Sequence, residues 1–194
     1  MNELTAVNKM LRSIGQVPVR ELPDGGQSDA RVARDTLLDY ALELQQEGYD
    51  FNTDEKVKLE PDVSGLIPFT DDVLRIKPSG YGRRYTIRNR RLYSLDDKTD
   101  IFDNPQELDI IRQVPFEELP FSLQNYVVIR AARVFANQVV GAPEQNGYNS
   151  EDEARARIAW LNTVAEDMHL NLLSDSGHQR PRSSQPYQAL TRGF

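Results

Sequence analysis

Few residues in this sequence are suited to acid–base or nucleophilic chemistry. There are two histidines, His169 and His178, and there is no cysteine. General bases that work near neutral pH are most often histidines, while thiol nucleophiles, disulfides and thiolate metal sites all need cysteine. His169 falls late in a helical segment, where we expect it to interact with the C-terminal end of the helix dipole. His178 falls in a polar tail. We therefore expect no catalytic residue, no metal site and no cofactor.

Acidic pairs are the second kind of candidate, because two carboxylates at a set separation can hydrolyse a glycosidic bond. The pairs and runs of this kind are Asp71-Asp72, Glu117-Glu118 and the acids from Asp96 to Asp103. The first pair is expected at the start of a strand and the second in a turn. The third run lacks the glycine and the terminal glutamate of an EF-hand loop. A structural role is favoured for each, and glycan hydrolysis remains the alternative function.

A basic segment lies between Val73 and Leu95, where seven basic residues occur without an acidic one, although the whole chain has a net charge of −7. Such a segment could be a protein-docking surface, a solvated strand face, or a nucleic-acid surface on which tyrosines stack with bases. Protein docking is favoured, because the acidic remainder of the chain would repel phosphate. Alternation on a hairpin predicts Arg84, Arg88 and Arg90 on one face. The candidate docking residues are Arg83, Arg84, Arg88, Arg90 and Arg91.

Helical periodicity predicts four helices, over residues 3–15, over residues 29–47, after Pro120 and from Ser150 onward. Ser28 or Asp29 is expected to cap the second helix, and Ser150 with Glu153 matches a capping box on the fourth. Each helix has one apolar stripe, which needs a partner to cover it. The expected stripe of the fourth helix is Ile158, Leu161, Ala165, Met168 and Leu172, with Trp160 and Val164 on its flanks.

Between residues 49 and 114 the apolar period changes to that of short strands, with frequent proline and glycine. A hairpin is predicted from two short runs joined through Asn89-Arg90. The expected fold class is α+β. It comprises a four-helix bundle from residues 1–48 and 115–173, a small antiparallel β domain inserted at 49–114, and an extended C-terminal tail at 174–194.

The tail from residue 174 is rich in serine, glutamine, proline, glycine and arginine, a composition that does not form a core by itself. We expect a partner or a neighbouring subunit to hold it. The residues proposed for that contact are His178, Arg180, Arg182, Tyr187, Leu190 and Phe194. The chain has no apolar run of about 18 residues, and its first residues do not match a secretory signal, so no membrane partner is expected.

Short motifs follow one another in a fixed order over residues 3–173. Near the start are Ser13-Ile14-Gly15 and Gly48-Tyr49-Asp50-Phe51-Asn52. Later motifs are Leu119-Pro120, Arg130-Ala131-Ala132-Arg133, Gly141-Ala142-Pro143-Glu144 and Glu151-Asp152-Glu153-Ala154-Arg155. In this order and spacing they resemble the tail tubular protein A family of T7-like podoviruses, the head-to-tail adaptors, except that Tyr49 stands where the family usually has tryptophan.

The resemblance implies a structural virion protein that is assembled in the host cytoplasm as a homo-oligomeric ring of twelve copies. It implies that the ring lies between the portal protein and the tail tubular nozzle protein, near the tail fibre protein. Genomic DNA would pass through the lumen without specific binding. The β part would face the nozzle, and the tail would reach the portal or a neighbour. Some relatives are credited with cleaving glycans, but no catalytic residue can be carried over to this sequence.

Overall fold

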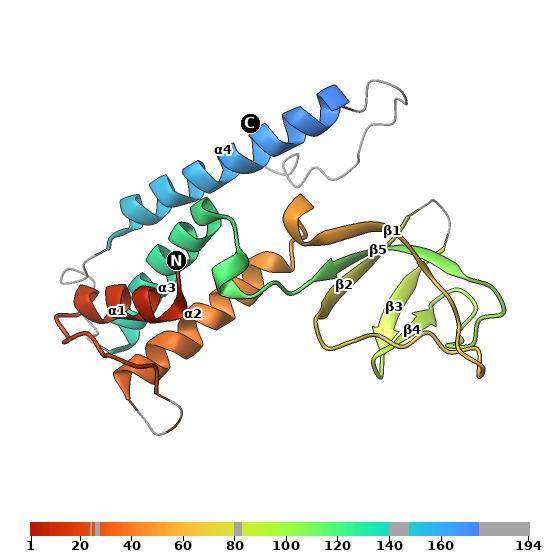
Figure 1. Cartoon of the computed structure of the whole chain (residues 1–194), viewed down its shortest axis with the longest axis horizontal. Coiled ribbons are helices and arrows are strands. Elements are labelled where there is room, and N and C mark those ends of the chain that lie inside the picture. Colours follow the sequence, from red (N-terminus) through yellow and green to blue (C-terminus); the bar gives the residue numbers. More distant parts are fainter. Residues whose placement is uncertain (24, 26–27, 80–82, 140–147, 175–194) are drawn as a thin grey trace, which may run out of the picture.

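The computed structural model describes residues 1–23, 25, 28–79, 83–139 and 148–174. It has the expected α+β composition, with helices on both sides of a β segment in the chain. The helices α1 (Glu3–Ser13), α2 (Asp29–Gln45), α3 (Phe121–Val139) and α4 (Ser150–Ser174) gather in one part of the molecule. The strands gather in another part, beside the C-terminal end of α2 (Figure 1).

The first two helices begin where their side chains can cap them. The side chain of Asn2 accepts a hydrogen bond from the backbone N–H of Thr5, at 2.9 Å. Ser28, rather than Asp29, caps α2 by accepting from the backbone N–H of Arg31, at 3.3 Å. Such caps satisfy N–H groups that have no partner within the helix. As the helical spacing of its apolar residues predicts, α2 has one buried stripe, formed by Ala30, Ala33, Leu37, Ala41 and Leu44.

The core of the helical part forms around α3. Helices α1, α2 and α3 contact one another, and α4 lies against α3. Leu123, Val127, Ala131 and Phe135 of α3 are fully buried, at the spacing of one helix face. Among the described residues, no helix is both long enough and apolar enough to cross a bilayer.

Two arginines of α3 hold the neighbouring helices. The Nη2 atom of Arg130 lies 3.1 Å from Oε1 of Glu43 on α2, and its guanidinium lies 4.9 Å from the ring centre of Tyr40. On the other side, Nε of Arg133 lies 2.6 Å from Oε2 of Glu153 on α4. The Arg133–Glu153 pair is only partly exposed, so it contributes more than an isolated surface pair does.

Helix α4 differs from the sequence prediction in its cap and in its buried face. Asn149, not Ser150, is the capping residue: its side chain accepts from the N–H of Asp152, and the Asp152 carboxylate accepts from the N–H of Asn149. The predicted stripe is also wrong as a core face. Ala156 and Trp160 are buried against the helical core, with Val164 partly buried beside them, whereas Ile158 is 58 % exposed.

The β part consists of two small antiparallel sheets. Strands β1 (Thr53–Leu59), β5 (Gln106–Arg112) and β2 (Val73–Pro78) form one sheet in that order, and β3 (Tyr85–Arg88) pairs with β4 (Arg91–Ser94). The hairpin packs against the three-stranded sheet around one cluster (Figure 1). The buried members of this cluster are Ile67, Leu92, Phe102 and Leu108. The β part therefore has its own core, much smaller than the helical one.

The central strand, β5, is not predicted by alternation. Ile110 and Ile111 are adjacent and both buried, which breaks the two-residue period of a half-exposed strand. The register explains their burial, because Ile110 pairs with Ile76 of β2 on one side and with Asp54 of β1 on the other. Ile111 lies beside Gly48 at the end of the helical part. Since β5 is the central strand of the sheet, adjacent side chains on its two faces are both buried.

Two buried amides join the helical part to the β part. Gln45, at the end of α2, accepts from the N–H of Val114 at 2.7 Å and donates to its carbonyl at 3.1 Å. Asn52, in the 3-10 turn Asp50–Asn52, donates to the carbonyls of Gln45 and Arg112, at 3.0 and 2.9 Å. Gly48 lies between them with a φ of +79°, and a Cβ there would collide with Ile111. The junction is therefore a specific structure, in which the side chains of Gln45 and Asn52 hydrogen-bond to backbone groups of both parts.

Aromatic residues extend the junction to α4. The ring centre of Tyr49 lies 4.9 Å from that of Trp160, and Phe51 lies 6.1 Å from it, both edge-on. Trp160 is 2 % exposed. The motif Gly48-Tyr49-Asp50-Phe51-Asn52 thus has a structural role: its aromatic residues hold α4 and its asparagine holds the ends of β1 and β5.

Candidate docking surface

The basic segment forms a tight hairpin, as predicted. Tyr85 pairs with Ser94 and Arg88 with Arg91, which leaves a two-residue turn at Asn89 and Arg90. These two residues have φ angles of 49° and 58°. Positive φ at both central positions defines the type I′ turn, whose twist matches that of the paired strands.

The pairing puts Arg88 and Arg91 directly opposite each other. Leu92, which is fully buried, points to the core, so its neighbour Arg91 points to the outside. The guanidinium of Arg88 lies 4.0 Å from the ring centre of Tyr93 on the same face. The prediction that Arg90 shares this face is wrong, because Arg90 lies in the turn and Arg91 takes that place.

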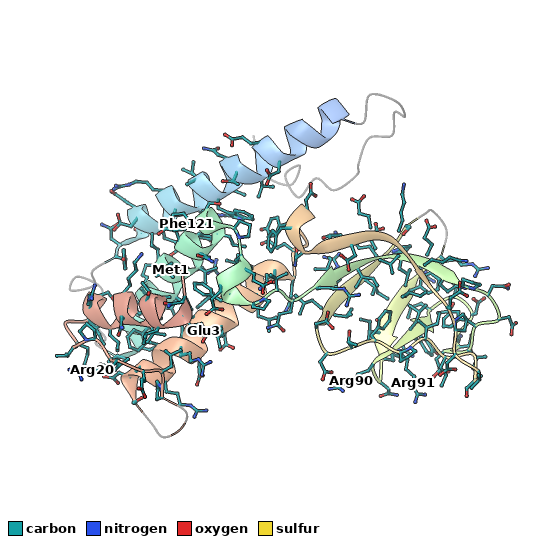
Figure 2. All side chains as sticks on the ribbon, in the orientation of Figure 1. Met1, Glu3, Arg20, Arg90, Arg91 and Phe121 are labelled. Atoms are coloured by element: carbon teal, nitrogen blue, oxygen red, sulfur yellow. The ribbon has the colours of Figure 1, made fainter. Side chains whose placement is uncertain are left out.

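The five candidate arginines divide into two groups. Arg84 binds Asp96, with Nη2 and Oδ1 2.7 Å apart, and Arg90 binds Asp71, with Nη2 and Oδ1 2.5 Å apart. Arg83, Arg88 and Arg91 make no ion pair with another described residue. Figure 2 shows Arg90 and Arg91 at the edge of the β part that faces away from α4.

Two arginines opposite each other on an exposed hairpin face are unfavourable unless an anion compensates them. The stacking of Arg88 on Tyr93 orients one guanidinium, but it does not remove the charge. The face around Arg88, Arg91 and Tyr93 is therefore electrostatically prepared for an acidic partner.

Three of the acidic candidates are engaged in ion pairs: Asp71 with Arg90, Asp72 with Arg112 and Asp96 with Arg84. The hydroxyl of Thr70, and then the guanidinium of Arg112, hold the pKa of Asp72 below its ordinary value of 3.8. The backbone N–H of Arg84, and then its guanidinium, lower the pKa of Asp96 in the same way. A glycosidase acid needs a raised pKa so that it is protonated near neutral pH, and these two carboxylates have the opposite shift. No group of residues in the described part could hold a metal ion.

Arg112 is a structural centre that the sequence analysis does not identify. Its Nε lies 2.7 Å from Oδ2 of Asp54, and its Nη1 lies 2.7 Å from Oδ2 of Asp72. It therefore ties β5 to β1 and to the start of β2. No local pattern points to it, because its partners lie 58 and 40 residues away.

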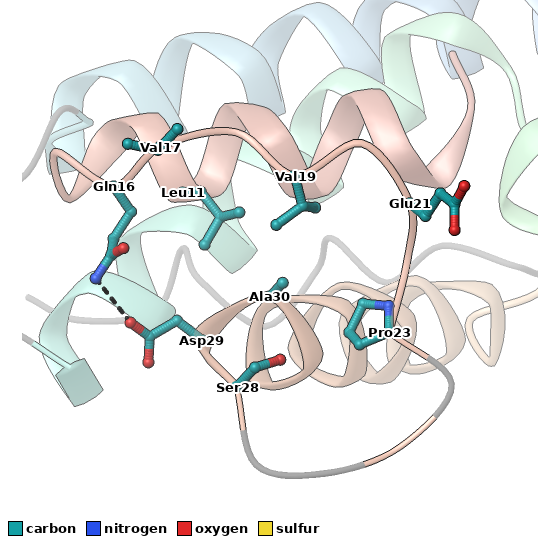
Figure 3. A pocket seen from close by; sticks show the side chains of 9 residues that line it. All are labelled: Leu11, Gln16, Val17, Val19, Glu21, Pro23, Ser28, Asp29 and Ala30. Atoms are coloured by element: carbon teal, nitrogen blue, oxygen red, sulfur yellow. Dashed lines mark hydrogen bonds between the residues drawn. The ribbon is translucent and has the colours of Figure 1, made fainter.

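A shallow pocket of about 230 Å³ lies between the connector after α1 and the start of α2 (Figure 3). Leu11, Val19 and Ala30 contribute apolar side chains, and Nε2 of Gln16 donates to Oδ2 of Asp29 at 2.9 Å. None of the candidate arginines or acidic pairs lines it. Its volume is below the range of roughly 300–1,000 Å³ that is usual for ligand sites.

The remaining candidate residues lie outside the described residues. They are His178, Arg180, Arg182, Tyr187, Leu190 and Phe194. The other histidine, His169, is in α4, and its side chain is likewise outside what the structure describes.

The sequence profile of the family described as "Tail tubular protein" matches residues 4–170, which include both the helical and the β part. The chain belongs to the tail tubular protein family. It is also similar to "Tail tubular protein A" of Klebsiella phage KP34, with 29 % identity over 154 residues, which cover 79 % of this chain and 82 % of that relative. The resemblance seen in the sequence motifs is confirmed. As a family member, the chain is a structural component of a bacteriophage tail.

Proposed function

We propose that this tail tubular protein is the subunit of an adaptor ring that joins the portal protein to the tail nozzle. In this proposal twelve copies enclose part of the channel through which the genome leaves the virion. The family membership over residues 4–170 carries the proposal, because it covers the helical part, the junction and the β part together. No enzymatic activity is part of this function.

The two parts of the chain would have different roles. Residues 1–48 and 115–173 would form the helical bundle of the ring, in which a neighbour covers what one copy leaves exposed. Residues 49–114 would form a separate β domain that docks on the nozzle protein, near the level of the tail fibre protein. The buried amides of Gln45 and Asn52 support this division, because they fix the angle at which the β part projects.

The arginine face would provide the docking contact. Arg88 and Arg91 make no ion pair with a described residue, so an acidic partner would gain their interaction without breaking an ion pair in the chain. Arg83 would add its charge beside them while it hydrogen-bonds to Tyr85. Arg84 and Arg90 would help to shape the same surface through their pairs with Asp96 and Asp71. The basic and apolar residues of the tail, from His178 to Phe194, would dock on the portal or on a neighbour.

The net charge of −7 agrees with a channel that does not bind DNA, since an acidic wall repels phosphate. Assembly and binding test the proposal directly. Purified chain, alone and mixed with portal protein, should form closed rings visible by electron microscopy and by mass photometry. If the full chain stays monomeric in both samples, the proposed ring function is wrong.

Docking is tested separately on the assembled rings. Arg88→Ser with Arg91→Ser should abolish binding of the nozzle protein, while Arg84→Ser with Arg90→Ser, which removes two already neutralised charges, should weaken it less. Equal losses in the two double variants would contradict the assignment of the docking face.

A further inference from the structure

Helix α4 has a second apolar face that no other described residue of the chain covers. Ala156, Trp160 and Val164 face the core. On another side of the helix, Ala154, Ile158 and Ala165 are exposed and Leu161 is partly exposed. Ile158 alone is 58 % exposed. A helix that only covered one core would carry polar residues on this side.

The spacing of this outer face is that of a coiled-coil seam. From Ala154 through Ile158 and Leu161 to Ala165 the steps are four, three and four residues, and Met168 and Leu172 continue them in the sequence. A strict seven-residue repeat of this kind keeps an apolar seam against a second helix. The small side chains of Ala154 and Ala165 would allow that helix to approach closely. The spacing therefore identifies the missing partner as a helix.

The charged residues beside the seam indicate the charge of the partner helix. Arg155 and Arg157 flank it near the start of α4, in the positions where coiled coils place the charges that select a partner. Arg155 is paired within its own helix, with Nη2 3.3 Å from Oε2 of Glu151. Arg157 is exposed and makes no ion pair with a described residue. An acidic helix face would complement both.

The chain itself contains such a face, on α2. Val32, Asp35, Asp39 and Glu43 are all exposed and follow one another at steps of three and four residues. Asp35 is paired with Arg31 of the same helix and Glu43 with Arg130 of α3, whereas Asp39 makes no ion pair with a described residue. The other two helices do not qualify, because α3 has no acidic residue and the one acid of α1, Glu3, is bound to Arg34 at 2.7 Å.

The positions of the two faces exclude contact within one chain. Helix α3 lies between α4 and α2 and contacts both of them (Figure 1). The outer seam lies on the side of α4 away from its buried residues, and Asp35 and Asp39 lie on the side of α2 away from its buried residues, so these positions do not meet within one chain. A contact between them must join two copies, and it uses a different surface on each, which is the head-to-tail arrangement that closes rings.

We infer that the outer seam of α4, centred on Ile158 and Leu161, docks on the acidic face of α2 in a second copy of this chain. Arg157 of one copy lies next to Asp39 of the other. This inference rests on the proposed ring function and adds to it the two surfaces that form the subunit contact.

Replacing one seam residue tests the apolar part of the contact. Ile158→Asp in the full chain should weaken self-association by at least about 30-fold, the effect of losing a central interface side chain. Ile101→Asp is the matched control, because Ile101 is 57 % exposed but lies in the β part. Circular dichroism should show both variants folded, since neither residue is buried. Equal self-association of wild type and Ile158→Asp, measured by sedimentation velocity, would overturn the inference.

A charge exchange tests the pairing of the two faces. Arg157→Glu and Asp39→Arg should each weaken association, because each puts like charges in contact. The double variant should recover most of the wild-type association, since it restores opposite charges. If the double variant is as weak as the worse single variant, Arg157 and Asp39 do not face each other.

Cross-linking separates this contact from the ring function as a whole. The chain has no cysteine, so single cysteines can be introduced without interference. A mixture of the Asp39→Cys and Arg157→Cys chains should oxidise to a mixed dimer, whereas Arg157→Cys alone should not dimerise. A homodimer of Arg157→Cys would instead show α4 packing on α4 and would overturn the inference.

The outcomes are distinguishable. Rings without the mixed disulfide would leave the proposed function standing and refute this interface. The mixed disulfide without rings would support the interface as an open-ended contact and refute the closed ring. The absence of both would refute the two proposals together.

Discussion

The helical part and the β part of this protein are stabilised in different ways. The helical part has one continuous core, which includes residues of all four helices, from Val7 in α1 to Trp160 in α4. It is centred on α3, which is buried along most of its length. The β part has a small cluster around Leu92 and Leu108, and ion pairs of Arg84, Arg90 and Arg112 join its strands and loops. Exposed ion pairs weaken as salt rises and are lost when their carboxylates are protonated, whereas apolar packing is much less sensitive to either change. Changes in pH and salt should therefore affect the β part more than the helical part.

Truncating Trp160 should have the largest effect on stability. Trp160→Ala removes the side chain that α4 packs against Tyr49 and Phe51, and we expect the free energy of unfolding to fall by about 3–5 kcal/mol. Urea denaturation followed by circular dichroism measures it. Glu166→Ala, at an exposed position of the same helix outside the proposed seam, should change the free energy by less than about 0.5 kcal/mol. Similar losses in both variants would mean that the buried face of α4 is not the one described.

Truncating the β core should destabilise the β part selectively. Leu92→Ala should lower its stability by about 2–5 kcal/mol, because Leu92 is fully buried in a cluster with few other members. Hydrogen exchange should show faster exchange in β1 to β5 while α3 stays protected. Ile101→Ala, at an exposed position, is the control. Uniform acceleration over both parts would show that they unfold as one unit.

Removing the junction amide should uncouple the two parts. Asn52→Leu removes the side-chain donor to the carbonyls of Gln45 and Arg112 and the acceptor of the Tyr49 N–H, and an unpaired buried polar group costs about 1–3 kcal/mol. We expect thermal unfolding to broaden or to split into two transitions in scanning calorimetry. Asn104→Leu, at an exposed position, should keep a single transition. A single sharp transition in Asn52→Leu would contradict the proposed role of the junction.

Acidification should weaken the β part by a smaller amount. The pKa of Asp72 is below 3.8 in the folded chain, so the stabilisation by its Thr70 and Arg112 contacts is complete above that pH and is lost as the pH falls through the folded pKa. Because the pair is about one-third exposed, roughly 0.2–1 kcal/mol is expected. Asp72→Asn should flatten the pH dependence of urea unfolding below pH 4.

Removing the unpaired arginines should have the smallest effect on stability. Arg88→Ser with Arg91→Ser relieves repulsion between opposite strands, so the free energy of unfolding should change by no more than about 0.5 kcal/mol. Thermal melting in low and in high salt measures it. A large loss of stability would show that these arginines hold the fold and are not reserved for a partner.

Local signals in the sequence were enough to predict much of this fold. The apolar spacing of α2 and its cap at Ser28 depend only on neighbouring residues, as does the Asn89-Arg90 turn, in which asparagine tolerates a positive φ. The arginine segment was also visible in the sequence, because its residues are close together in the chain. What could not be read there was which of these arginines are already paired, since Asp71 and Asp96 reach them through the fold.

The amino-acid sequence by itself determined the helices, the hairpin, the basic segment and, through its ordered motifs, the family. Only the tertiary structure decided which face of α4 is buried. Helix α4 has two apolar faces, one with Trp160 and one with Ile158, and periodicity cannot tell which of them packs against the core. It also decided that β5 is central, that Arg112 joins three strands, and that Gln45 and Asn52 fix the junction. In each case the contacts join residues far apart in the chain, so no local pattern records them.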